Sequence, residues 1–323
     1  MLLFAALLAA PLTPARGEPV TVKLGTLAPA GSAWHEALKD MARRWEEASG
    51  GQVRLRVYAG GVQGDEGDMI RKLSVGQLQA VAVSNIGLHD VVTEPQAFST
   101  PLLFGNDAEM ECALSRVKER LDAALRRRGL VPLQWSRLGT AVFFCNAPFR
   151  TPAELARAKM FAWEGDPATV KAWRAAGLKP VVLSTSELLP ALTTGMVDCA
   201  ANVPLYMLTS RAFERARHLV DLPLGPVLGA TVVRKDVWDR IPQQVQQRLL
   251  EISREIGARI DAEVRRLNAD AVHAMEGQGL DVVPVDREQW LPALEKTWAV
   301  IRGEVVSAEF FDELRAARDA CRG

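Results

Sequence analysis

The sequence predicts a two-lobed α/β protein, and three observations lead to that prediction. Strand patterns alternate with helix patterns over residues 20–83, and the same alternation returns over residues 130–195. One long helical pattern follows over residues 242–276. Strands that alternate with helices form a parallel sheet, and 323 residues with 48% hydrophobic residues suffice for two cores. We therefore expect two α/β lobes joined by a long helix.

The first α/β unit follows from residue periodicity. Apolar residues alternate with polar ones in its first two strands, whereas the third strand is apolar on both faces. Ser32 can cap the first helix, and Gly50 with Gly51 can end it. Asp65, Glu66 and Asp68 suit the start of the second helix, where the helix dipole favours negative charge. The expected elements are strands at 20–24, 53–58 and 78–83 and helices at 34–48 and 66–75.

A second α/β unit shows the same alternation of strand and helix patterns. Thr151 can cap a short helix whose first position is Pro152, and both choices favour a helix start. A later helix ends at Gly195. The expected elements are strands at 130–133, 140–145, 159–163 and 180–183 and helices at 151–155, 167–176 and 186–194.

The pattern from Pro242 to Glu276 predicts a single spanning helix. Apolar residues recur every three or four positions. At ~1.5 Å per residue, roughly 35 helical residues extend about 50 Å, enough to lie along two lobes. The alternative is a pair of shorter helices broken at Gly257.

The N-terminal residues predict export. Met1 to Ala10 are nearly all apolar, and Ala15, Arg16 and Gly17 offer small residues where a signal peptidase would cut. We expect a signal peptide at 1–17, with a membrane anchor as the less favoured alternative. The lobes are then expected to comprise 18–138 plus 226–258 (lobe I) and 139–225 plus 259–323 (lobe II).

Composition and motifs argue against several function classes. Lys plus Arg equals Asp plus Glu at 39 each, so no overall field favours nucleic acid. The histidines belong to no metal motif, and neither a nucleophile elbow nor a phosphate loop is present. We expect no enzyme activity, no cofactor and no metal. The alternative enzyme is a hydrolase that pairs Cys145 or Cys199 with His218.

The cysteines Cys112, Cys145, Cys199 and Cys321 have no metal-site spacing. In an exported protein they can form disulfides, for which three complete pairings exist. Free thiols buried as small hydrophobes are an equal alternative. The sequence does not choose between these states.

A binding cleft is the best-supported kind of site. Ligands of α/β proteins bind beyond the carboxyl ends of parallel strands and between domains. Polar and aromatic residues follow the expected strands at those places. The candidates are Trp34, His35, Gln63, Ser84, Asn85, Trp163, Glu164, Asp166, Asn202 and Tyr206. For each, a role in packing or in a turn is the alternative.

The run from Gly195 to Pro204 resembles a signature of the periplasmic solute-binding proteins of TRAP transporters (DctP family). Asn202 stands where that family's "G-x-V-D-G-x-E-N-P" run faces the ligand, whereas Cys199 and Ala201 replace its second Gly and its Glu. The resemblance extends from Val22 to Arg302. Further motifs that carry it lie at 23–26, 49–53, 60–66, 101–104, 149–155 and 238–242.

The resemblance implies a periplasmic-binding-protein (Venus-flytrap) fold with a long helix spanning both lobes. It also implies a periplasmic protein that captures a small molecule between the lobes and delivers it to TRAP membrane permease subunits. A carrier or sensor that hands a hydrophobic ligand or lipid to a soluble periplasmic partner is the alternative.

The family's usual carboxylate-binding charges are missing here. Phe161 occupies the position of the arginine that clamps the carboxylate, Ala141 replaces a second common arginine, and Ala201 replaces a glutamate. An anion buried without a cationic partner loses its hydration and gains little electrostatic attraction in exchange. We therefore expect a neutral or lipophilic ligand among apolar side chains. These are Ala141, Phe143, Phe161, Trp163, Met196, Val203 and Tyr206, with Gln63, Asn85 and Asn202 as polar contacts.

Two further expectations concern this departure from the family pattern. An organic acid held by a non-standard arginine, such as Arg137 or Arg234, is the alternative ligand. The opening from Leu24 to His35 resembles a subgroup that lacks the clamping arginine. That likeness implies a tetratricopeptide-repeat periplasmic partner.

Overall fold

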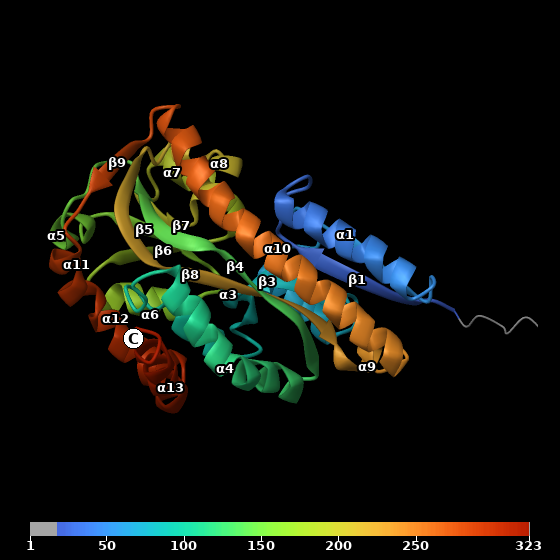
Figure 1. The fold of residues 1–323 in the computed structure, drawn as a ribbon. Helices are drawn as coiled ribbons and strands as arrows, with labels where there is room; N and C mark the ends of the chain where they lie inside the picture. Colours follow the sequence, from blue (N-terminus) through green and yellow to red (C-terminus); the bar gives the residue numbers. More distant parts are fainter. Residues whose placement is uncertain (1–17, 323) are drawn as a thin grey trace, which may run out of the picture.

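The computed structural model describes residues 18–322 and shows one mixed sheet surrounded by helices (Figure 1). The strand order is β2-β1-β3-β8-β4-β7-β5-β6, and β9 pairs with β8. The strands are β1 (Val20–Thr26), β2 (Val53–Tyr58), β3 (Ala80–Ser84), β4 (Leu130–Cys145), β5 (Lys159–Trp163), β6 (Lys179–Leu183), β7 (Cys199–Asn202), β8 (His218–Arg234) and β9 (Asp281–Pro284). The α/β prediction is confirmed, whereas the expected signal peptide lies outside the described residues.

All six expected helices are present, and further helices that the sequence analysis does not predict accompany them. In the first half they are α1 (Ala33–Ala48), α2 (Glu66–Ser74), α3 (Asn85–Leu88), η1 (Glu94–Ser99) and α4 (Asp107–Arg127). Next come α5 (Pro152–Leu155), α6 (Pro167–Ala175), η2 (Thr185–Glu187), α7 (Leu188–Thr194), α8 (Pro204–Thr209), η3 (Ala212–Glu214) and α9 (Lys235–Trp238). The last are α10 (Gln243–Glu276), α11 (Arg287–Leu294), α12 (Lys296–Val300), η4 (Ile301–Val305) and α13 (Ala308–Asp319). No helix in residues 18–322 is long and apolar enough to cross a membrane.

The two strands expected at 130–133 and 140–145 are parts of the single long strand β4. Pairing between β4 and β8 is antiparallel and shifts register at three places, between Pro132 and Gln134, Arg137 and Gly139, and Ala141 and Phe143. Such bulges bend a strand, which lets β4 and β8 run through both halves of the molecule. The sheet is therefore parallel at β1–β3 and at β5–β7 and antiparallel between them.

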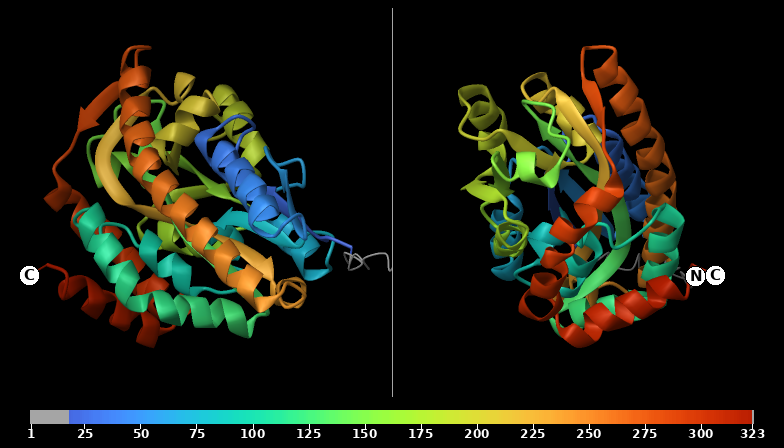
Figure 2. Two further views of the ribbon diagram at one scale, coloured as in Figure 1. Left: turned by 45° about the vertical axis from the view of Figure 1, so that its right-hand side comes forward. Right: turned by 90° about the vertical axis from the view of Figure 1, so that its left-hand side faces the viewer.

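Helix α10 is continuous over 34 residues and lies along both halves (Figures 1 and 2). Ile252, Ile256 and Ile260 join the core that contains Trp45 of α1, whereas Ala271 and Met275 join a separate core with residues of α7 and α8. The expected spanning helix is confirmed, and the break at Gly257 is wrong. Gly257 instead allows close packing, because a Cβ there would lie 2.6 Å from Oε1 of Gln134.

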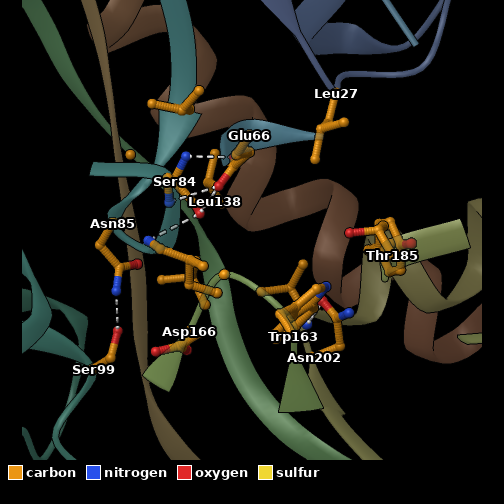
Figure 3. Close-up of a pocket in the computed structure, with 18 of the residues that line it drawn as sticks. Leu27, Glu66, Ser84, Asn85, Ser99, Leu138, Trp163, Asp166, Thr185 and Asn202 are labelled. Carbon is orange, nitrogen blue, oxygen red and sulfur yellow. Dashed lines mark hydrogen bonds between the residues drawn. The ribbon is translucent and has the colours of Figure 1, made fainter. Parts of the chain in front are cut away.

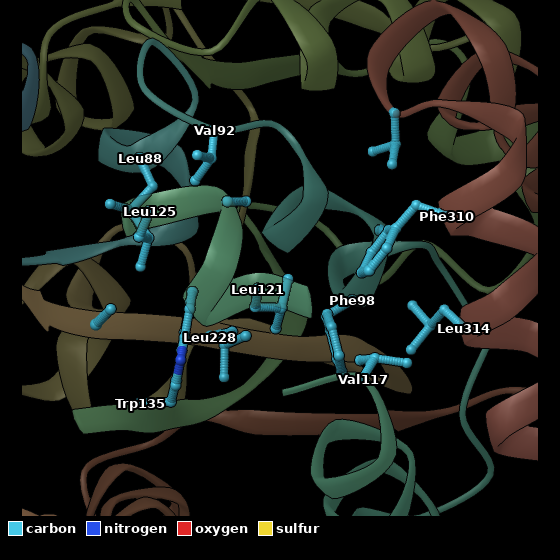
Figure 4. Close-up of a cluster of buried hydrophobic side chains, with 14 of the residues drawn as sticks. Leu88, Val92, Phe98, Val117, Leu121, Leu125, Trp135, Leu228, Phe310 and Leu314 are labelled. Carbon is cyan, nitrogen blue, oxygen red and sulfur yellow. The ribbon is translucent and has the colours of Figure 1, made fainter. Parts of the chain in front are cut away.

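The C-terminal helix packs on the first half of the chain. Phe310 and Leu314 of α13 share a buried cluster with Phe98 of η1 and with Val117 and Leu121 of α4 (Figure 4). Residues 259–323 are expected in lobe II, and the sequence carries no signal of this packing. The lobe boundaries themselves stay a prediction.

Both pairs of cysteines form disulfides. Cys112 of α4 is joined to Cys321 beyond α13, and Cys145 of β4 is joined to Cys199 of β7. The free-thiol alternative is therefore wrong. The hydrolase alternative loses its nucleophile as well, because a disulfide sulfur offers no thiolate. His218 instead lies 3.0 Å from the carboxylate of Asp281.

Candidate ligand-binding site

A cavity of about 620 Å³ lies between the two halves of the chain, beyond the ends of β1, β3, β5 and β7 (Figure 3). We call its lining residues between Thr26 and Ser99 the N-terminal wall, and those between Phe161 and Thr209 the C-terminal wall. Residues of β4, β8 and α10 lie between these walls, and Ile301 and Val305 of η4 also contribute. Residues 18–322 hold no group of three or more metal-binding side chains.

The structure brings most of the predicted site residues to this cavity. The lining residues among them are Trp34, Ser84, Asn85, Ala141, Phe161, Trp163, Glu164, Asp166, Ala201, Asn202, Val203 and Tyr206. Four others do not line it, namely His35, Gln63, Phe143 and Met196.

Local geometry explains why those four point elsewhere. His35 follows Trp34 along α1, and its Nδ1 accepts a hydrogen bond from the Gly31 N–H at 2.9 Å. The side-chain oxygen of Gln63 accepts from Nζ of Lys72. Phe143 lies on the same side of β4 as Ala141, but it is fully buried against Trp173 and Trp290. Met196, in the turn after α7, is 52% exposed.

Glu66 organises the N-terminal wall. Its buried carboxylate accepts hydrogen bonds from the Ser84 N–H at 2.7 Å, the Ser84 hydroxyl at 2.6 Å and the Gly87 N–H at 2.9 Å. Burial raises the pKa of Glu66 above its ordinary value, and these hydrogen bonds oppose the rise. A Cβ at Gly87 would lie 2.8 Å from Glu66, so glycine is required for this approach. Glu66 thereby fixes α3 at the cavity edge.

Asn85 presents an acceptor on the same wall. Its Nδ2 donates to Gln96 Oε1 at 2.8 Å and to Ser99 Oγ at 3.1 Å, and Gln96 Nε2 donates to the Asn85 carbonyl at 2.9 Å. This network fixes the orientation of the side-chain amide. Oδ1 of Asn85 is buried and has no partner among the described residues. Trp34 also lines this wall, with a buried and unpaired indole N–H.

The C-terminal wall carries aromatic side chains and one amide donor that has no partner among residues 18–322. Phe161 and Trp163 pack edge to face with ring centroids 5.2 Å apart. Figure 3 shows Trp163 beside Asn202, across the cavity from Asn85. Oδ1 of Asn202 accepts from the Val203 N–H at 2.8 Å, so its unpaired group is the Nδ2 donor.

Asp166 is the buried carboxylate of this wall. It caps α6 by accepting from the Thr169 N–H at 3.0 Å. Burial raises the pKa of Asp166, against these helix-terminal hydrogen bonds.

Ionisable side chains around the cavity are predominantly acidic. The lining carboxylates are Asp65, Glu66, Asp68, Asp90, Glu164 and Asp166. Arg71 is the one lining arginine or lysine in the described chain, and it forms an ion pair with Asp68. Arg137 instead bridges Asp107 and Glu111, and Arg234 binds Asp236. Neither suggested non-standard arginine lines the cavity.

Most of the chain matches one protein family. Residues 24–304 match the model of bacterial extracellular solute-binding protein, family 7 (DctP). The chain belongs to this family. It is a TRAP-type periplasmic solute-binding protein, and such proteins bind their solutes without converting them. The assignments to TRAP transport, to the periplasm and to a non-enzymatic role are confirmed.

Similar proteins bind organic acids. The C4-dicarboxylate-binding periplasmic protein DctP of Vibrio cholerae is 24% identical over 80% of this chain and 79% of its own length. A TRAP solute-binding protein of Pseudomonas putida F1, solved with D-glucuronate, has a TM-score of 0.85 at 22% identity, covering 93% of this chain and 97% of its own. One from Ralstonia eutropha, solved with (S)-2-acetolactate, has a TM-score of 0.86 at 19% identity, covering 93% and 99%. These ligands do not support the expected neutral or lipophilic ligand.

Sequence reasoning missed several cavity residues. The acidic run at Asp65 was interpreted as a helix start, and Asp65 and Asp68 do form the capping box of α2. Glu66 within that run turns inward instead, and only its burial against α3 reveals this. Ile301 and Val305 arrive from the C-terminal segment, for which the sequence carries no signal.

Proposed function

We propose that this protein captures a small, uncharged solute with an apolar body and hydrogen-bonding ends, and presents it to TRAP membrane permease subunits. One observation carries the proposal. The cavity combines aromatic walls and carboxylates with unpaired neutral polar atoms, which are Trp34 Nε1, Asn85 Oδ1 and Asn202 Nδ2. An uncharged solute with both donors and acceptors would satisfy these atoms.

Charge supports an uncharged solute over an anion. A carboxylate entering this cavity would lose hydration worth several kcal/mol. Little Coulomb attraction is available to offset this loss, because Arg71 is 73% exposed and already paired with Asp68. The lining carboxylates would repel an anion further. Apolar area on Phe161 and Trp163 instead contributes about 25 cal/mol per Å² buried.

An organic acid is the second candidate, favoured by the solutes of the similar solved structures. Its carboxylate would accept hydrogen bonds from Trp34 Nε1 and Asn202 Nδ2, both of which are unpaired donors. Arg71, released from Asp68, would supply the cation at the cavity edge. This arrangement differs from the one that the sequence analysis suggested, since it uses neither Arg137 nor Arg234.

The partner proposals follow from the family. Permease subunits are the proposed recipients of the solute. A tetratricopeptide-repeat periplasmic protein is a proposed additional partner, and it rests on the subgroup-like opening from Leu24 to His35. Delivery to a soluble partner alone is the carrier alternative. A binding measurement with purified permease subunits separates the two, because only the permease proposal expects the solute-loaded protein to associate with them.

Mass spectrometry of solutes that co-purify from the periplasm tests the proposal directly. A matched pair then tests charge, since D-glucuronate and its neutral amide differ at one group. We expect the native solute to be uncharged. In titrations that monitor tryptophan fluorescence, we expect D-glucuronate to bind no better than D-glucuronamide. A carboxylic acid as the native solute would establish the second candidate instead.

A further inference from the structure

One hydrogen-bonded contact joins the two walls across the cavity. Oδ2 of Asp65, at the start of α2, accepts from the Thr185 hydroxyl at 2.8 Å and from the Thr185 N–H at 3.4 Å. Both residues line the cavity, on the N-terminal and C-terminal walls respectively. The contact spans 120 residues of sequence.

The elements that carry these residues belong to different parts of the fold. Helix α2 is anchored through Met69 and Leu73 in one buried cluster, whereas α7, directly after Thr185, is anchored through Leu188 in another. In the sheet, β8, β4, β7 and β5 separate β3, which follows α2, from β6, which precedes Thr185. A contact between such distant elements depends on how closely the two walls approach each other.

Both ends of the contact are held in place locally. Oδ1 of Asp65 caps α2 by accepting from the Glu66 N–H at 2.8 Å, which leaves Oδ2 for Thr185. The turn at Thr185 is fixed by Ser184, whose N–H and hydroxyl donate to the Glu187 carboxylate at 2.8 and 2.7 Å. Little side-chain entropy is therefore lost when the contact forms.

A second element of the C-terminal wall also faces Asp65. Burial raises the pKa of Tyr206 on α8 to about 12, and the negative charge of Asp65 adds to the effect. The carboxylate of Asp65 thus belongs to the same cavity lining as Thr185 of η2 and Tyr206 of α8. No lysine or arginine is bonded to it among the described residues, so Thr185 is the donor that satisfies its second oxygen.

We infer that Asp65 and Thr185 form an inter-lobe latch, which favours the closed arrangement of the two walls even without a solute and slows solute release. A hydrogen bond to a carboxylate is stronger than one between neutral groups. Opening the walls breaks it and returns both groups to water. The latch acts through the distance between the walls and is independent of the chemistry of the solute.

Distance measurements on ligand-free protein test the latch. Spin labels at Val75→Cys and Met196→Cys report on the two halves, since both side chains are exposed and the native cysteines are paired in disulfides. Thr185→Val removes the donor hydroxyl at nearly constant volume, and Thr185→Ser retains it. We expect Thr185→Val to lower the ratio of closed to open molecules about tenfold, and Thr185→Ser to leave it near the wild-type value.

Controls separate the latch from general destabilisation. Thr193→Val removes a hydroxyl that bonds only to Leu189 O within its own helix, and it should not change the distances. Asp65→Ser keeps a cap for α2 but removes the carboxylate oxygen that accepts from Thr185, so it should open the walls as Thr185→Val does. A wild-type protein without a closed population, or equal populations in Thr185→Val and Thr185→Ser, would overturn the inference. Because no solute is added, a wrong proposed solute leaves this test unaffected.

Discussion

The two walls of the cavity are built on different principles. In the N-terminal wall, Glu66 is hydrogen-bonded to Ser84 and Asn85 to Gln96, so most polar groups are satisfied within the wall. In the C-terminal wall, Phe161 and Trp163 supply apolar area, and Asn202 adds a donor that has no partner. The N-terminal wall thus supplies a rigid polar edge with most of the lining charge, whereas the C-terminal wall supplies the apolar area that an uncharged solute would cover.

Removing the Glu66 carboxylate should destabilise the protein at the N-terminal wall. Glu66→Ala leaves the Ser84 and Gly87 N–H groups without their acceptor, and it should lower the free energy of unfolding by about 3 kcal/mol. Urea denaturation measures the loss. Glu164→Gln, at an exposed lining carboxylate, is the matched control and should change stability little. Equal effects of the two substitutions would contradict the organising role of Glu66.

A cation in the C-terminal wall should change the solute that this wall selects. Phe161→Arg places a guanidinium in the cavity lining that can bind a carboxylate with two hydrogen bonds, so D-glucuronate should bind at least tenfold more tightly than to the wild type. Because Phe161 is buried, the change should also lower stability by about 1–3 kcal/mol. Isothermal titration measures the affinity, with Phe161→Leu as the control. No gain with a folded Phe161→Arg protein would mean that the carboxylate does not approach this wall.

The unpaired amide of Asn202 should contribute to affinity more than to stability. Asn202→Asp replaces the Nδ2 donor with an acceptor, and it should weaken binding of the co-purified solute about tenfold, or ~1.4 kcal/mol. Asn146→Ala removes an exposed amide outside the cavity and is the control. An unchanged affinity in Asn202→Asp would show that the solute does not use this donor.

The smallest expected effect is a change of stability with pH, and its source is Asp261, beside the cavity where α10 meets β4. Burial raises the pKa of Asp261 to about 6, although its oxygen accepts from the Arg137 N–H at 3.0 Å. Between pH ~4 and ~6 the folded state holds a proton that the unfolded state has released, so stability falls as the pH rises through this window. Because Asp261 is partly exposed, the fall should be about 1 kcal/mol. Unfolding at several pH values should show a smaller fall in Asp261→Asn, and an identical profile would exclude Asp261 as its source.

Much of the fold could be predicted because its signals are local. The periodicity at 242–276 predicted α10, and the caps at Ser32 and Thr151 predicted where α1 and α5 begin. Cavity residues at strand ends, such as Asn85 and Trp163, were also predicted, since parallel strands end at a common edge. The prediction for Phe143 is wrong because Trp173 and Trp290, which are distant in sequence, cover its ring, and local spacing carries no signal of that packing.

The sequence by itself determined the alternation of strands and helices over residues 20–83 and 130–195, the long helix α10 and the family. These depend on residue identity and on spacing along the chain. Only the tertiary structure decided the cysteine pairing, the burial of Glu66 and the contact of Asp65 with Thr185. Each of these joins residues that are distant in sequence, and their approach is set by the packing of the whole sheet and its helices.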